Sequence, residues 1–215
     1  LQSFLGNPLA SPDLLGISGG SGLAAVSAIL LLGTTGPLVA VFAFVGGSAV
    51  AVVLMLAGRS LRDGGFRLIL AGIGVSFLTS ALINLMMVRA KIEQAQVALL
   101  WLTGSLASTP WWQVLVVLVV FVALVPALIV ASRWLPLVQL GREAAHGLGV
   151  ASGPVRVVVV TSAVLLTAVT CAFVGPISFI ALCAPAIARA LLRHGAVGLG
   201  TSAVVGAALL LAADL

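Results

Sequence analysis

The stretch WQVLVVLVVFVALVPALIVAS, residues 112–132, contains no charged side chain in its 21 positions. A helix of this length rises about 31 Å at ~1.5 Å per residue, which matches the hydrocarbon core of a bilayer. Because lipid offers the backbone no hydrogen-bond partners, an apolar segment that crosses it satisfies its own amide groups as a helix. The stretch therefore predicts a membrane-spanning helix.

The same pattern recurs along the chain of 215 residues, in which 62% of the side chains are hydrophobic and 7% are charged. The mean hydropathy is +1.32, and so few charges cannot cover a soluble protein of this size. We predict an all-α, polytopic transmembrane helical bundle that forms a single domain over residues 1–215. Its expected spans are residues 15–32, 37–57, 66–88, 112–132, 155–174, 176–192 and 196–213.

The basic residues indicate which side of the membrane each loop faces. If the amino end is inside, eight arginines fall on inner loops and helix ends, whereas the outer side holds only Arg89 and Lys91. Such an excess marks the cytoplasmic side. Segment 89–111 then lies outside, and we expect it to form a helix in the membrane interface, with Trp101, Trp111 and Trp112 at the headgroup level.

The interiors of the spans exclude several classes of protein. No Asp, Glu, Lys or His lies deep in any span, although proton-coupled carriers, redox proteins and voltage sensors usually need such groups. Small residues are common instead, and ISGGSG at 17–22 is expected to allow close helix packing. In span 66–88 the small and polar positions are Gly72, Gly74, Ser76, Thr79, Ser80 and Asn84.

The chain contains neither a zinc-protease motif nor a phosphate-loop motif. HExxH and GxxxxGK[ST] are both missing from the sequence, so we expect neither an enzyme nor a cofactor bound by this chain. His146 and His194 are isolated and predict no metal site. Cys171 and Cys183 lie in apolar runs and are expected to be buried. The net charge of +5 is explained by the inner loops and does not indicate a nucleic-acid partner.

The decapeptide GREAAHGLGV, residues 141–150, is unusually polar for this chain and falls on the inner side. Ala144 and Ala145 favour a compact helix, while Gly141 and Gly149 permit sharp entry and exit. Arg142 and Glu143 offer surface ion pairs. From these residues alone, an ordinary solvated loop and a docking surface for another protein both remain open.

Four stretches carry a resemblance to a known family. They are LQSFLGNPLASPDLLGISGGSG at 1–22, LILAGIGVSFLTSALINLMM at 68–87, GREAAHGLGV at 141–150 and FVGPISFIALCAPAIAR at 173–189. In the last, Pro176 is expected to start a helix and Pro185 to kink it. Together with WLTGSLASTPWW at 101–112, they resemble, in order, the FecCD-type permease subunit of type II ABC importers, which carry ferric siderophores, haem or cobalamin.

The resemblance implies a ten-span permease in the bacterial cytoplasmic membrane. The seven spans would be its third to ninth, so we expect a fragment that lacks the first span, most of the second and the tenth. The family often has a charged residue where Gly6 stands and commonly a His where Ala186 stands, and these departures fit one half of a tandem-fused permease. The partners implied are ABC ATPase subunits that bind ATP and Mg²⁺, a second permease unit and an outer solute-binding protein.

The resemblance also assigns site residues. The coupling surface for the ATPase would be Gly141, Arg142, Glu143, Ala144, Ala145, His146, Gly147, Leu148 and Gly149. The translocation path would be lined or shaped by Asn7, Pro8, Gly72, Ser76, Thr79, Ser80 and Asn84.

The function expected from the resemblance is ATP-driven import of a bulky iron chelate, with a ferric siderophore as the leading cargo and haem or cobalamin behind it. The alternatives are a secondary carrier or exporter of a small solute that works without an ATPase, and a membrane scaffold that transports nothing. A secondary carrier normally has charge inside the membrane.

Overall fold

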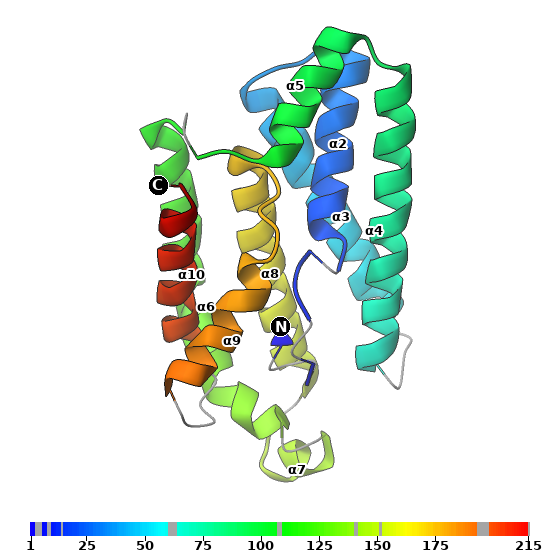
Figure 1. The fold of residues 1–215 in the computed structure, drawn as a ribbon. Helices are drawn as coiled ribbons and strands as arrows, with labels where there is room; N and C mark the ends of the chain where they lie inside the picture. Colours follow the sequence, from blue (N-terminus) through cyan, green and yellow to red (C-terminus); the bar gives the residue numbers. More distant parts are fainter. Residues whose placement is uncertain are drawn as a thin grey trace. The chain divides into compact units, whose positions relative to one another are not determined.

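The computed structural model describes residues 1–2, 6–7, 10–13, 15–59, 64–106, 109–139, 142–150, 152–192 and 198–214. Within these ranges every long regular element is a helix (Figure 1). The helices are α2 (Ile17–Leu32), α3 (Pro37–Arg59), α4 (Gly64–Arg89), α5 (Ile92–Thr103), α6 (Trp111–Gln139), α7 (Arg142–Gly147), α8 (Ser152–Val174), α9 (Ile180–Leu192) and α10 (Leu199–Asp214).

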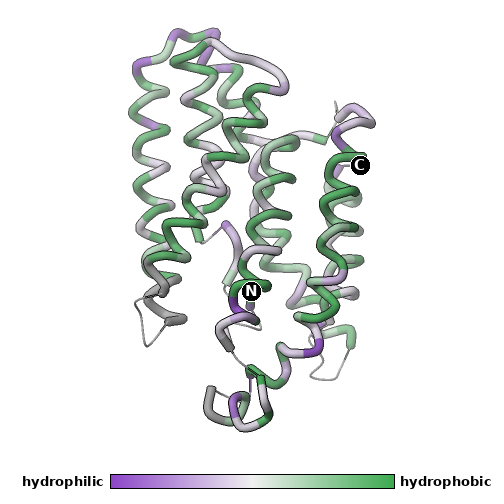
Figure 2. The backbone as a smooth tube through the Cα atoms, turned by 180° about the vertical axis from the view of Figure 1, so that it is seen from behind, coloured by the Kyte–Doolittle hydropathy of each residue, from purple (hydrophilic) through white to green (hydrophobic). Residues whose placement is uncertain are grey.

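Each of the seven predicted spans contains a helix. Four helices contain segments long and apolar enough to cross a membrane, namely Pro37–Leu56, Ile69–Arg89, Trp111–Gln139 and Gly153–Val174. The remaining three, α2, α9 and α10, are apolar but have only 16, 13 and 16 residues. Figure 2 shows hydrophobic residues along most of the helices and hydrophilic ones mainly near their ends and in the connections. The all-α, polytopic fold is confirmed.

The helix expected to start at Pro176 begins four residues later, at Ile180. Residues 175–178 are not helical, and Phe179 adopts a positive φ of 67°, a conformation that a helix cannot contain. The prediction for Pro176 is therefore wrong. Pro185 does lie inside α9, as expected.

Residues 175–178 are not helical because the chain at Val174 and Gly175 crosses the end of α5. The amide of Ser105 donates a hydrogen bond of 2.9 Å to the carbonyl of Val174. Gly104 and Gly175 both have positive φ, and a Cβ built on Gly175 would lie 2.5 Å from the carbonyl oxygen of Trp101. Two backbones can approach this closely only where side chains are missing.

The chain forms two compact units, which we describe one at a time. The α2 unit comprises Pro12–Leu118 and Val164–Ile177. The α7 unit comprises Leu1–Ser11, Val119–Ala163 and Ser178–Leu215. Since α6 and α8 each contribute a part to both units, neither unit is a continuous stretch of sequence.

Helix α2 is the centre of the α2 unit and packs against α3, α4 and α5 (Figure 1). Its closest contact is with α3, because a Cβ on Gly46 would overlap the carbonyl oxygen of Gly20 and the Cβ of Ala24. Likewise, a Cβ on Gly47 would overlap the Oγ of Ser21. The close packing predicted for ISGGSG is thus confirmed.

An apolar cluster extends this contact along α2 and α3. Its buried members are Ala25, Val26, Ile29, Val39, Ala40, Ala43, Ala98 and Ala172. Trp101, which we expected at the headgroup level, packs against this cluster, whereas Trp111 is 84% exposed. Trp112 meets Phe173 edge to face with ring centroids 5.6 Å apart. The three tryptophans therefore differ in their surroundings. Segment 89–111 contains a helix, α5, as expected.

In the α7 unit, α6 and α8 pack together near the ends that flank α7. The buried residues of this contact are Ala131, Leu135, Val155 and Val159, with Trp134, Val138, Val150 and Val158 packed around them. Helices α9 and α10 pack against each other in the same unit. The short α7 connects α6 to α8 beyond this apolar contact (Figure 1).

The contact between α2 and α3 predicts a difference between two glycines. Gly46→Ala would place a methyl group on the Gly20 carbonyl, so we expect it to destabilise the protein by about 1–3 kcal/mol, as overpacking does. Gly74→Ala is the matched control, because a Cβ there meets nothing within 4 Å. We expect the control to be neutral or stabilising by up to about 1 kcal/mol. Thermal unfolding in detergent measures both, and equal melting temperatures would contradict the packing account.

Candidate functional site

The decapeptide forms the short helix α7 and a capped exit. The amide of Val150 donates to the carbonyl of Ala145 at 2.9 Å, and the amide of Gly149 donates to the carbonyl of His146 at 3.0 Å. Gly149 has a φ of 79°. These two bonds around a left-handed glycine form a Schellman motif, which satisfies carbonyls at the end of a helix. The predicted role of Gly149 as the exit from the helix is confirmed.

The predicted coupling residues divide into an exposed set and a buried one. The exposed residues are Ala144, His146, Gly147, Leu148 and Gly149. Ala144 and Leu148 are four positions apart and so lie on one face, and the apolar side chain of Leu148 is 59% exposed. Ala145 has no exposed surface. Ala145 is thus covered within this chain, and the role of all these residues in coupling stays a prediction.

Three further coupling residues fall at the edge of what the structure describes. Gly141 and the side chains of Arg142 and Glu143 lie outside the described part of the chain. The backbone of Arg142 and Glu143 belongs to α7.

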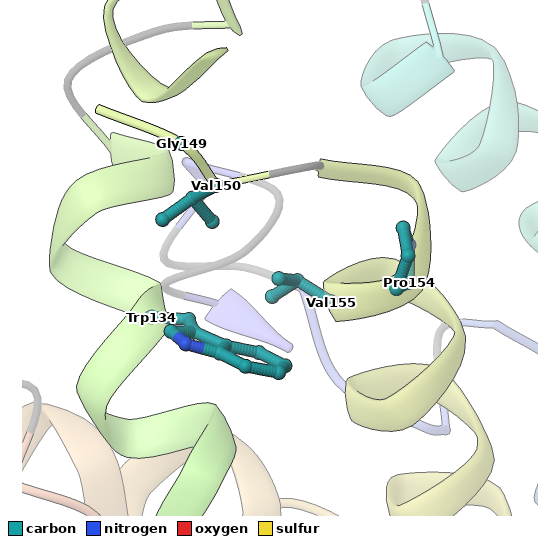
Figure 3. Close-up of a pocket in the computed structure, with 5 residues that line it drawn as sticks. All are labelled: Trp134, Gly149, Val150, Pro154 and Val155. Atoms are coloured by element: carbon teal, nitrogen blue, oxygen red, sulfur yellow. The ribbon is translucent and has the colours of Figure 1, made fainter. Parts of the chain in front are cut away.

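A partly open cavity of about 170 Å³ lies beside the exit of α7. Figure 3 shows Val150 and Val155 pointing into the space over the indole ring of Trp134. Gly149 and Pro154 complete the lining among the described residues. The cavity thus lies where the end of α6, the exit of α7 and the first turn of α8 meet.

The predicted path residues on α4 also divide between two environments. Gly72 and Thr79 are buried, and they face α2. A Cβ on Gly19 would lie 2.5 Å from the Oγ1 of Thr79, and a Cβ on Gly16 would lie 3.2 Å from the Gly72 carbonyl. This face of α4 is therefore a helix-packing surface.

The hydroxyl groups on that face bond to their own helix. Ser76 Oγ donates to the Gly72 carbonyl at 2.9 Å, and Thr79 Oγ1 donates to the Val75 carbonyl at 3.0 Å. Bonds of this kind satisfy polar side chains inside apolar helices. The exposed residues of the predicted path are Ser80 and Asn84. The role of all these residues in a path stays a prediction.

Two of the predicted path residues, Asn7 and Pro8, lie near the amino end of the chain. Asn7 is half-buried; its amide donates to the Gln2 carbonyl at 3.2 Å, and its carbonyl accepts from Ala10 at 3.1 Å. Pro8 lies outside the described residues.

Asp13 is a half-buried acid that the motifs did not single out. Its Oδ1 accepts a short hydrogen bond of 2.5 Å from Ser18 Oγ, which also lies 3.7 Å from Cys171 Sγ. Its carbonyl accepts from Ser76 at 3.5 Å. Burial raises the pKa of the Asp13 carboxyl, and the bond from Ser18 partly offsets that rise. A signal existed in the sequence, since Asp13 is the only acid before Asp63.

Gln2 is a second buried polar residue that sequence reasoning missed. Only 6% of it is exposed. Its Nε2 donates to the Leu182 carbonyl at 3.4 Å, and its Oε1 accepts from Arg189 Nη2 at 2.9 Å. The missing N–H of Pro185 frees the carbonyl of Ala181 rather than that of Leu182, so no local signal in the sequence pointed to the bond from Gln2.

The contacts described at these sites are packing contacts and hydrogen bonds. Within the described ranges, no three His, Cys, Asp or Glu residues lie close enough to hold a metal ion. Cys171 is buried as expected, but Cys183 is exposed, because it lies on an uncovered side of α9. His194 lies outside the described residues.

Together, the fold and α7 define a multi-pass helical membrane protein with a short exposed helix between two spans. The model of the FecCD transport family matches residues 1–215. The chain therefore belongs to the FecCD transport family, which confirms the resemblance carried by the five stretches.

The chain is 38% identical over 215 residues to the ferric enterobactin transport system permease protein FepG of Escherichia coli K12. It is 39% identical over 216 residues to the Fe(3+)-citrate import system permease protein YfmE of Bacillus subtilis 168. Both comparisons cover all of this chain and 65% of the relative. A solved ABC transporter assigned to the metal-chelate type, in an inward-facing conformation, matches 99% of this chain and 69% of its own, with a TM-score of 0.88 and 29% identity.

The cap of α7 predicts opposite effects at two nearby glycines. Gly149→Ala forces a side chain into a positive φ, which costs about 1–2 kcal/mol. Gly147→Ala is the control, because it lies inside the helix with nothing within 4 Å of a Cβ, and it should stabilise α7 by up to about 1 kcal/mol. Hydrogen exchange of the α7 amides should quicken in the first variant and slow in the second. Equal exchange in both would contradict the capping role.

Asp13 predicts a dependence of stability on pH. Because burial raises the pKa of this carboxyl, the folded chain holds the proton more tightly than the unfolded chain. The contribution of the protonated Asp13 to stability is full below pH ~4, and it is lost as the pH rises through the raised pKa of the folded chain. Asp13→Asn keeps an acceptor for Ser18 and should remove this loss. Melting temperatures from pH 4 to 8 test it, with Glu93→Gln at an exposed carboxylate as control. Parallel curves for wild type and Asp13→Asn would contradict the assignment.

Proposed function

We propose that this chain is part of the transmembrane permease of an ATP-driven importer in the bacterial cytoplasmic membrane. The observation that carries the proposal is α7, a capped helix between two spans whose exposed face includes Ala144 and Leu148. Family membership over the whole chain supports it. The arginine bias of the sequence supports a cytoplasmic position for α7.

In this proposal α7 is the contact for an ABC ATPase subunit, which binds ATP and Mg²⁺. The small side chains of Ala144 and Gly147 allow a partner to approach the helix closely, and Leu148 offers an exposed apolar contact. Ala145 is buried, and the Schellman motif closes the last turn of the helix. The importer also needs a second permease unit, either identical, paralogous or fused, and an outer solute-binding protein.

The proposed cargo is a bulky iron chelate, with a ferric siderophore foremost. The relatives named for ferric enterobactin and Fe(3+)-citrate support this class of cargo, and haem and cobalamin follow from the family resemblance. On α4, the exposed Ser80 and Asn84 remain available to such a path, whereas Ser76 and Thr79 act mainly in helix packing.

The proposal predicts that charge on the exposed face of α7 prevents assembly. Leu148→Asp and Ala144→Arg, made in the complete permease, should abolish co-purification of the ATPase and ATP-dependent uptake of iron chelate. Both positions are exposed, so the fold should survive, and size-exclusion chromatography checks this.

The matched control is Ile92→Asp. Ile92 is a 75% exposed apolar residue at the start of α5, on the side of the membrane predicted to be outside. This variant should retain the ATPase. If the α7 variants also retain both the ATPase and uptake, α7 is not the coupling helix. Uptake that persists without any ATPase would favour a secondary carrier.

A further inference from the structure

Helix α9 contains a point at which its backbone hydrogen bonding is interrupted. Pro185 lies inside the helix, and proline has no N–H, so the carbonyl of Ala181 lacks the bond that residue 185 would otherwise donate. Sharp bends in helices occur mainly at such positions. Helix α9 therefore consists of two parts, residues 180–184 and residues 185–192, which are joined at a weak point.

One buried side chain is bonded to both parts of α9. Gln2 Nε2 donates to the Leu182 carbonyl at 3.4 Å, and Gln2 Oε1 accepts from Arg189 Nη2 at 2.9 Å. Leu182 lies before Pro185 and Arg189 lies one turn after it. The side-chain amide of Gln2 thus spans the interruption, although it does not replace the bond that is missing at Ala181.

The two ends of this connection differ in their access to water. Gln2 is only 6% exposed, and a buried amide that loses a partner is costly. Arg189 is exposed, so water can take the place of Gln2 on its guanidinium. The bond between them is charge-assisted and therefore stronger than a neutral one. The connection is thus favoured when closed, and Arg189 is the end at which it opens.

We propose that Gln2 is a conformational lock on α9, which fixes the angle between the two parts of the helix at Pro185. A side chain bonded to one part alone would anchor the helix without fixing this angle. Because Gln2 is bonded on both sides of Pro185, the second part bends only when the bond to Arg189 opens. Gln2 and Arg189 are then positioning residues for α9. The inference does not depend on the proposed function, since it involves neither an ATPase nor a cargo.

Hydrogen exchange of α9 in the complete permease tests the lock. The helical bonds of the amides at 186–188 run to the carbonyls at 182–184 and so cross Pro185. Gln2→Leu removes both side-chain bonds at similar size, and exchange of these amides should quicken by roughly threefold to tenfold, as expected for the loss of one hydrogen bond. Arg189→Leu should have the same effect. Since Arg189 is exposed, this variant keeps the test open if Gln2→Leu does not fold.

Two further variants serve as controls. Arg133→Leu makes the same substitution at an exposed arginine on α6 in the same compact unit, and it should leave the exchange of α9 at the wild-type rate. Arg189→Lys retains a cationic donor for Gln2, so its exchange should lie nearer to wild type than that of Arg189→Leu.

Pro185→Ala distinguishes a lock on the bend from an ordinary anchor. Alanine supplies the missing N–H and makes α9 continuous, so Gln2→Leu in this background should change the exchange by less than about twofold, because the two effects are coupled. The inference is overturned if Gln2→Leu and Arg189→Leu keep wild-type exchange. It is also overturned if Gln2→Leu quickens exchange equally with and without Pro185, because Gln2 would then only anchor the helix.

Discussion

The approach of α2 to α3 is the contact on which the α2 unit depends. Between apolar helices in lipid there is no hydrophobic driving force, so association relies on van der Waals contact and hydrogen bonds. Gly20, Gly46 and Gly47 let the two backbones approach until a single methyl group would not fit. With α2 held in this way, its other sides are placed against α4 and α5. Gly16 and Gly19 allow a similarly close approach to α4.

Satisfaction of polar groups is the second constraint that shapes this chain. Ser76 and Thr79 bond to carbonyls on their own helix, so they can lie in a packed interface without a partner from another helix. Gln2 instead bonds across to α9, to the Leu182 carbonyl and to Arg189. A buried polar group left without a partner is costly in an apolar environment. These bonds accommodate Ser76, Thr79 and Gln2, whereas among the described residues Ser21 Oγ and Ser48 Oγ are buried without a hydrogen-bond partner.

Much of the candidate site could be predicted from local patterns. Alanines followed by GLG predicted the short helix and its exit, because helix propensity and the left-handed conformation of glycine are properties of a few neighbouring residues. The burial of Ala145 could not be predicted in the same way, since a helix of six residues has no periodic stripe long enough to show which face is covered. The start of α9 was also missed, because Gly175 crosses Gly104, a residue about seventy positions away in the chain.

The sequence by itself determined that the chain is helical, that its helices are apolar enough to cross a membrane, and that it belongs to the FecCD transport family. These follow from hydropathy and from short motifs, which act locally or can be matched in order along the chain. Only the tertiary structure decided which small residues touch, that Ser76 and Thr79 face α2 while Ser80 and Asn84 are exposed, and that a cavity lies beside Val150. The reason is physical: a helix has the same backbone on every side, and only the helices packed around it distinguish one face from another.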